Sequence, residues 1–287
     1  MWQSIAEQIS HSLGYQTHIE SKTKFDKLGL FDHYRLTLQN GQCLYLKLTD
    51  KSNRHLLESE FDTCQTLANT QTLIPPEAIS LGQCKEGYFL YYPWQTEQPL
   101  CIKSSSQLGI QLAKLHNWGE QKQFGFDSDN YIVSTLQPNR WTDKWADFFA
   151  EQRIGWLLAL LAEQGLYFGQ VDDFVEQTKQ RLKHHQPVPS LIHGHLCPEN
   201  IKLTPQGPRC IQPACYWGDA ECDLAMLEFN SPLPDSFYQA YLAYRPLAHG
   251  YEERRHLYRL YYRLLLLLQY GGQHLESTQQ ELYELFQ

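Results

Sequence analysis

Apolar residues recur at helical spacing at the start of the chain. Trp2, Ile5, Ile9 and Leu13 are three or four positions apart, so they fall on one face of a helix. The glycine that follows them is a residue that commonly ends a helix. The pattern predicts an amphipathic helix over residues 2–14.

The next segment shows the two-residue alternation of a β-strand. Runs over 36–38 and 43–48 flank the dipeptide Asn40-Gly41, which tolerates the positive φ angles of a tight hairpin turn. In the second run the leucines share one face, and Lys47 points to the other. The pattern predicts a β-hairpin that carries Lys47.

A helix is predicted over 54–68, and it holds a carboxylate on its apolar face. Glu60 lies four positions from both Leu56 and Cys64, so it shares their side of the helix. A buried carboxylate needs a partner, and the preceding strand offers Lys47. A strand lysine paired with a helix glutamate fixes nucleotide phosphates in kinase folds. An exposed lysine beside a helix-edge glutamate fits the same spacing and remains the alternative.

After a predicted strand at 88–92 and a break at Pro93-Trp94, the pattern becomes mainly helical. A strand-rich first third and a helix-rich remainder predict an α+β architecture with two lobes, 1–93 and 94–287. The helices are expected at 108–116, 145–164, 171–184, 236–244, 252–270 and 275–286.

Composition excludes several classes of function. The 287 residues are 42% hydrophobic and 20% charged, as in an ordinary globular protein, and the net charge of −8 argues against nucleic-acid binding. The longest apolar run, Leu264–Leu268, is too short to cross a membrane, and residues 1–5 lack the basic start of a signal peptide. Eight cysteines without a CxxC pair fit buried, reduced thiols. We therefore expect a cytoplasmic protein.

Two segments carry candidate chemistry. Residues 191–200 read Leu-Ile-His-Gly-His-Leu-Cys-Pro-Glu-Asn, and residues 211–214 read Ile-Gln-Pro-Ala. They resemble the catalytic core of the fructosamine (ketosamine) kinase family, which is related to the aminoglycoside phosphotransferases. In that family the segments read His-Gly-Asp-Leu-Trp-x-Gly-Asn and Ile/Phe-Asp-Pro-Ala. Further blocks at 124–126, 148–153 and 215–226 are similar, so the resemblance covers nearly the whole chain.

The resemblance implies a protein-kinase-like, two-lobed fold and an ATP- and Mg²⁺-dependent phosphorylation of the sugar part of ketosamines, which are glycated amines. It implies that Lys47 holds the ATP phosphates, that Glu60 orients Lys47, and that position 195 accepts the substrate hydroxyl proton. The remaining implied site residues are Gly29 and Tyr92 on the nucleotide side, Asn200 and position 212 as metal ligands, and Trp217, Asp219 and Glu221 in the substrate cleft.

The chain departs from the family where the chemistry needs acids. His195 replaces the catalytic aspartate, and a cationic imidazole would repel a metal that aspartate attracts. Gln212 replaces the metal-binding aspartate with a neutral ligand. The phosphate-covering loop reads Lys27-Leu28-Gly29, and Leu28 places a Cβ where backbone should approach phosphate. Cys197 and Glu199 replace the tryptophan and glycine of the catalytic loop.

Three hypotheses follow. The chain is a pseudokinase that binds a nucleotide weakly or a small glycated amine or sugar derivative. Alternatively, it is an active ketosamine or other small-molecule kinase that uses His195 or Glu199 in place of the lost acids. The third hypothesis is a metal-binding protein that is not a kinase, built on the zinc-competent side chains of His193, His195 and Cys197.

Overall fold

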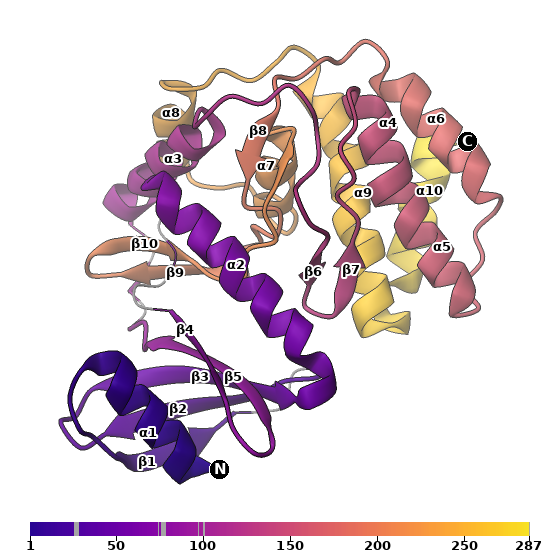
Figure 1. Cartoon of the computed structure of the whole chain (residues 1–287). Coiled ribbons are helices and arrows are strands. Elements are labelled where there is room, and N and C mark those ends of the chain that lie inside the picture. Colours follow the sequence, from indigo (N-terminus) through magenta and orange to yellow (C-terminus); the bar gives the residue numbers. More distant parts are fainter. Residues whose placement is uncertain (26–28, 74, 76–78, 97, 100, 287) are drawn as a thin grey trace.

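The computed structural model describes residues 1–25, 29–73, 75, 79–96, 98–99 and 101–286. A sheet built by the N-terminal third lies on one side of the molecule, and a larger, mainly helical part lies on the other (Figure 1). This arrangement confirms the predicted α+β architecture.

The sheet has five antiparallel strands in the order β1-β2-β3-β5-β4. The strands are β1 (Ile19–Lys24), β2 (Asp32–Leu38), β3 (Cys43–Asp50), β4 (Ser80–Gln83) and β5 (Gly87–Pro93). The predicted hairpin joins β2 to β3, with Gly41 at φ 80°, as a tight turn requires. Strand β2 begins four residues earlier than predicted, and its added length pairs His33 with Lys47.

The two faces of the sheet contact different elements. Helix α1 (Trp2–Leu13) packs Ile5 and Ile9 against one face, on Leu36 and Leu46. Helix α2 (Arg54–Thr70) packs against the other face, which also turns toward the helical part of the molecule. Alternation along β3 thus places its leucines under α1 and directs Lys47 toward α2.

The remaining elements form the helical part. They are α3 (Ile102–His116), β6 (Asn130–Ile132), β7 (Thr135–Gln137), α4 (Trp145–Phe149), α5 (Trp156–Glu163), α6 (Val171–Leu182), β8 (Ser190–Ile192), β9 (Ile201–Thr204), β10 (Gly207–Cys210), β11 (Tyr216–Gly218), α7 (Glu221–Leu227), α8 (Asp235–Leu242), α9 (Tyr251–Tyr270) and α10 (Leu275–Phe286). Short 3₁₀ turns occupy Lys51–Asn53, Pro198–Asn200 and Gly272–His274.

The predicted helix over 145–164 is divided by a π-helical segment, Ala150–Gly155. Arg153 in this segment is fully buried and donates hydrogen bonds to the Pro138 carbonyl at 2.6 Å and to Asn139 Oδ1 at 2.7 Å. Its guanidinium also lies 4.0 Å from the centre of the Tyr216 ring. The wider helical turn thus carries a buried cation that ties the helices to strand β11.

Strands β8 and β11 pair antiparallel and hold the loop 193–200 against helices α7 and α9. Aromatic packing surrounds them: Trp145 stacks on Phe148 and donates a hydrogen bond to the Tyr258 hydroxyl at 2.9 Å. Over the described residues, no helix reaches the length and apolar character needed to cross a membrane.

Candidate functional site

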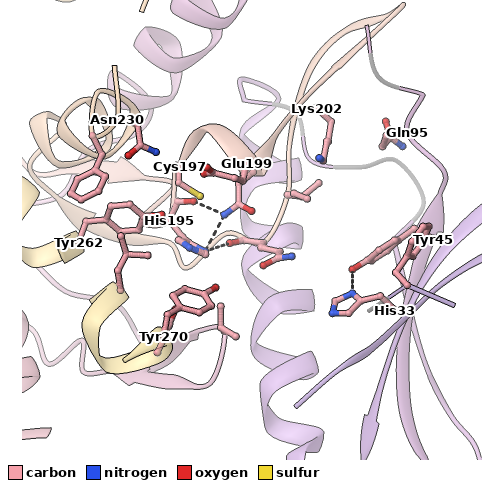
Figure 2. A pocket seen from close by; sticks show the side chains of 18 of the residues that line it. His33, Tyr45, Gln95, His195, Cys197, Glu199, Lys202, Asn230, Tyr262 and Tyr270 are labelled. Atoms are coloured by element: carbon pink, nitrogen blue, oxygen red, sulfur yellow. Dashed lines mark hydrogen bonds between the residues drawn. The ribbon is translucent and has the colours of Figure 1, made fainter. Parts of the chain in front are cut away.

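A cavity of about 910 Å³ lies between the sheet and the helical part. This volume suits a cofactor or a small substrate. Side chains from both parts converge on it, and Figure 2 shows His33 and Tyr45 facing the loop that carries His195, Cys197 and Glu199. Its lining includes Phe25, His33, Tyr45, Tyr92, Trp94, His195, Cys197, Glu199, Asn200, Gln212, Phe229, Tyr262 and Tyr270.

The predicted pair of Lys47 and Glu60 is present. The Lys47 Nζ atom lies 2.6 Å from Glu60 Oε2, and the two side chains are only 4% and 10% exposed. The ammonium also lies 4.1 Å from the centre of the Phe31 ring. Burial reduces solvent screening, so this pair holds the ammonium in one place more firmly than a surface salt bridge would.

Asp223 anchors the loop that follows strand β8. Its buried carboxylate accepts hydrogen bonds from the backbone nitrogens of His193 at 2.7 Å and Gly194 at 3.0 Å. Gly194 has φ 76°, and a Cβ there would lie 2.1 Å from the Ala214 carbonyl oxygen. Asp223 is not among the site residues that the resemblance implies, and its role becomes visible only in the structure. An acid directly before the apolar run Leu224–Leu227, in a helix whose residues are all buried, was the available signal.

His195 is a neutral side chain held by its own loop. Burial, with a smaller contribution from neighbouring His193, lowers the pKa of His195 to about 3. Its Nδ1 lies 3.1 Å from Asn200 Nδ2 and 3.3 Å from the Gln212 carbonyl oxygen. The amide can only donate and the carbonyl can only accept, so one of these bonds forms in each tautomer.

Asn200 and Gln212 meet beside this ring. The Asn200 amide nitrogen also donates to the His195 carbonyl oxygen at 2.8 Å, which leaves its Oδ1 as the atom suited to a ligand. Gln212 has φ 53°, a left-handed conformation that costs a residue with a Cβ about 1–2 kcal/mol. The two residues offer neutral amide oxygens, whereas Mg²⁺ sites in kinases rely on carboxylate charge. The donor set therefore does not fit Mg²⁺.

The structure does not bring the ligand atoms of His193, His195 and Cys197 to metal-ligand spacing, so it does not support the hypothesis of a metal site on these three residues. Among the described residues, the group with metal-ligand spacing is His185, Asp219 and Glu221. His193 is fully buried, and its Nδ1 accepts a hydrogen bond from the His195 backbone nitrogen. Burial raises the pKa of the Cys197 thiol to about 11, which disfavours the thiolate that binds metals.

The acids predicted for the substrate cleft lie in a separate polar network, outside the cavity lining. Asp219 Oδ2 contacts His185 at 2.6 Å and accepts from the Tyr258 hydroxyl at 2.7 Å. Glu221 receives two hydrogen bonds from Arg254, at 2.7 and 2.8 Å. With these partners the group is an internal ion-pair network, so the metal spacing alone does not indicate a bound ion.

Of the other predicted site residues, one lines the cavity and two do not. Tyr92 lines the cavity and stacks on Tyr45, with ring centroids 4.8 Å apart. Gly29 has φ 59° and does not contribute to the lining, and Lys27 and Leu28 lie outside the described residues. Trp217 also lies outside the lining, where it stacks on Trp118.

Comparison with known proteins shows similarity to kinases that act on small molecules. The family model for fructosamine kinase matches residues 1–287. A probable ketoamine kinase of Vibrio parahaemolyticus is 43% identical over 280 residues, covering 97% of each chain.

Solved structures of kinase-like phosphotransferases have the same fold. The putative fructosamine-3-kinase of Haemophilus somnus superposes with a TM-score of 0.94 at 31% identity, covering 100% of this chain and 98% of the other. A macrolide 2'-phosphotransferase of Brachybacterium faecium has a TM-score of 0.58 at 15% identity, covering 98% and 97%, and shows likeness of fold alone. The expected kinase-like phosphotransferase fold is confirmed.

Proposed function

The chain belongs to the fructosamine kinase family, and from that premise we propose that it is a catalytically impaired member that retains the ligand cavity. The family acts on small-molecule ketoamines, and kinase-like proteins generally use ATP and a metal ion. In this chain the cavity would take a nucleotide weakly, or a glycated amine or sugar derivative, with little transfer of phosphate.

The observation that carries the proposal is the neutrality of the two acid positions. His195 is uncharged and hydrogen-bonded within its own loop, so it supplies no anion to orient a hydroxyl. Gln212 supplies no charge for a metal that would bridge the phosphates. In contrast, Lys47 and Glu60 keep the geometry of a phosphate-holding pair. The lysine–glutamate pair of the site is therefore retained, whereas the two acid positions are not.

A second candidate is an active kinase in which Glu199 replaces the lost acid. Glu199 is exposed, lines the cavity and immediately precedes Asn200. Its carboxylate could accept a substrate proton if the hydroxyl comes within about 3 Å. This candidate predicts turnover that depends on Glu199.

A phosphorylation assay on a model ketosamine separates the two candidates. The impaired-kinase proposal expects turnover near background in the unmodified protein, with no change on Glu199→Gln. Glu253→Gln, at an exposed acid of helix α9 away from the cavity lining, is the matched control. Clear turnover that is lost in Glu199→Gln and kept in the control would replace the first candidate with the second.

A further inference from the structure

His33 carries a ring nitrogen whose hydrogen-bonding capacity is not used. Its side chain is 7% exposed and lines the cavity, and its Nδ1 is hydrogen-bonded to the Tyr45 hydroxyl (Figure 2). The Nε2 atom is buried and has no partner among the described residues. A buried polar atom without a partner costs about 1–3 kcal/mol, so native sites usually satisfy it with water or a ligand.

The protonation of this pair determines what Nε2 offers. Burial, with a contribution from Lys47, lowers the pKa of His33 to about 4. Burial raises the pKa of Tyr45 above its usual range, so both groups are neutral near pH 7. An imidazole nitrogen is a better acceptor than a phenol oxygen. The Tyr45 hydroxyl therefore donates to Nδ1, and the ring hydrogen lies on Nε2 as a free donor.

Lys47 is the neighbour that defines the ligand. His33 and Lys47 are directly opposite each other in the register of β2 and β3, so their side chains leave the sheet on the same face. The Lys47 ammonium has three hydrogens, and Glu60 accepts one of them. A neutral N–H donor next to an ammonium suits an oxygen that carries negative charge, such as a phosphate oxygen.

We propose that His33, which lines the cavity, acts through Nε2–H with the adjacent buried Lys47, which lies outside the lining, to bind a phosphate group of a ligand there without a metal ion. The inference rests on the nucleotide-binding part of the proposed function. It assigns a phosphate contact to the sheet side of the cavity, away from the amide pair of Asn200 and Gln212, whose donor set does not fit Mg²⁺. The contact also places the phosphates close to the stacked rings of Tyr45 and Tyr92.

Calorimetry with ADP and with adenosine, both in the presence of EDTA, tests the proposal on the full chain. We expect the unmodified protein to bind ADP more tightly than adenosine. His33→Phe should weaken ADP binding about tenfold and leave adenosine binding unchanged. His33→Gln places an amide N–H near the position of Nε2 and should keep ADP affinity within about threefold of the unmodified protein.

Thermal unfolding without ligand provides the control for folding. His33→Phe and His33→Leu remove the unpaired nitrogen and also the acceptor of the Tyr45 hydroxyl, so the two effects oppose each other and each variant should unfold near the temperature of the unmodified protein. Equal ADP affinity in the unmodified protein and His33→Phe would overturn the proposal, as would absence of ADP binding or failure of both apolar variants to fold. None of these results involves turnover, so they leave the proposed loss of catalysis to its own assay.

Discussion

Replacing Asp223 by asparagine tests whether this residue holds the loop at 193–200 in place. The carboxylate accepts from His193 N, from Gly194 N and from His116 Nε2 at 3.2 Å, and it is fully buried. Asparagine has one carbonyl oxygen, so one backbone N–H would face an amide N–H instead of an acceptor. A lost hydrogen bond to a charged group contributes about 1.5–3 kcal/mol, and the orphaned donor adds to this loss. We expect the free energy of unfolding to fall by about 3 kcal/mol or more.

Urea unfolding at pH 7 measures this change, with Asp127→Asn at an exposed position as the matched control. The control should change the free energy of unfolding by less than about 0.5 kcal/mol. Asp223→Asn should also lower ligand affinity, because the loop it anchors contributes His195 and Cys197 to the cavity. A loss of less than about 1 kcal/mol in Asp223→Asn would show that the three hydrogen bonds are not the anchor inferred here.

Further predictions concern pH, backbone strain and metal dependence. Burial lowers the pKa values of His193 to about 4 and of His195 to about 3, both below the unfolded value of 6.5, so the unfolded state binds more protons. The contribution of these two histidines to the free energy of unfolding is complete above pH 6.5. It should decline by up to about 1.4 kcal/mol per pH unit for each histidine as the pH falls towards 4. Urea unfolding at pH 7 and pH 5 measures this decline, and equal free energies of unfolding at the two pH values would contradict it. Gln212→Gly should raise the free energy of unfolding by about 0.5–1 kcal/mol, because Gln212 has the left-handed φ of 53° that glycine adopts without strain. Gln71→Gly, at φ 55°, is the matched comparison, and a lower free energy of unfolding in both variants would refute the strain argument. ATP binding should be weak and nearly the same with and without Mg²⁺, so strong Mg²⁺-dependent affinity in calorimetry would show that Gln212 does not impair the metal site.

The sequence was informative where local periodicity decides the contact. The helix period fixes the face on which Glu60 lies, and the strand period fixes the face of Lys47, so their pairing could be predicted before the fold was known. The Asn40-Gly41 turn is also a local signal, because the length and type of a hairpin turn set the register of the two strands that it joins.

Contacts between distant segments could not be predicted in this way. Asp223 meets the loop 30 residues earlier only because β8 and β11 pair beneath it. Asp219 and Glu221 were expected in the cleft, but His185 and Arg254 draw them into a network outside the cavity. The additional length of β2, which brings His33 to the cavity, is different: Tyr34 continues the alternation of Leu36 and Leu38, so this part was predictable from the sequence.

The most direct test of the proposed loss of catalysis is restoration of turnover with a model ketosamine. His195→Asp alone should not restore it, because the metal remains poorly held and residues that act together are strongly non-additive. His195→Asp with Gln212→Asp should give measurable phosphorylation, because Lys47 and Glu60 are already paired and Asn200 stands beside both positions. Turnover by the unmodified chain within tenfold of the double variant, which is about 1.4 kcal/mol of barrier, would contradict the account and show that the natural side chains perform the chemistry.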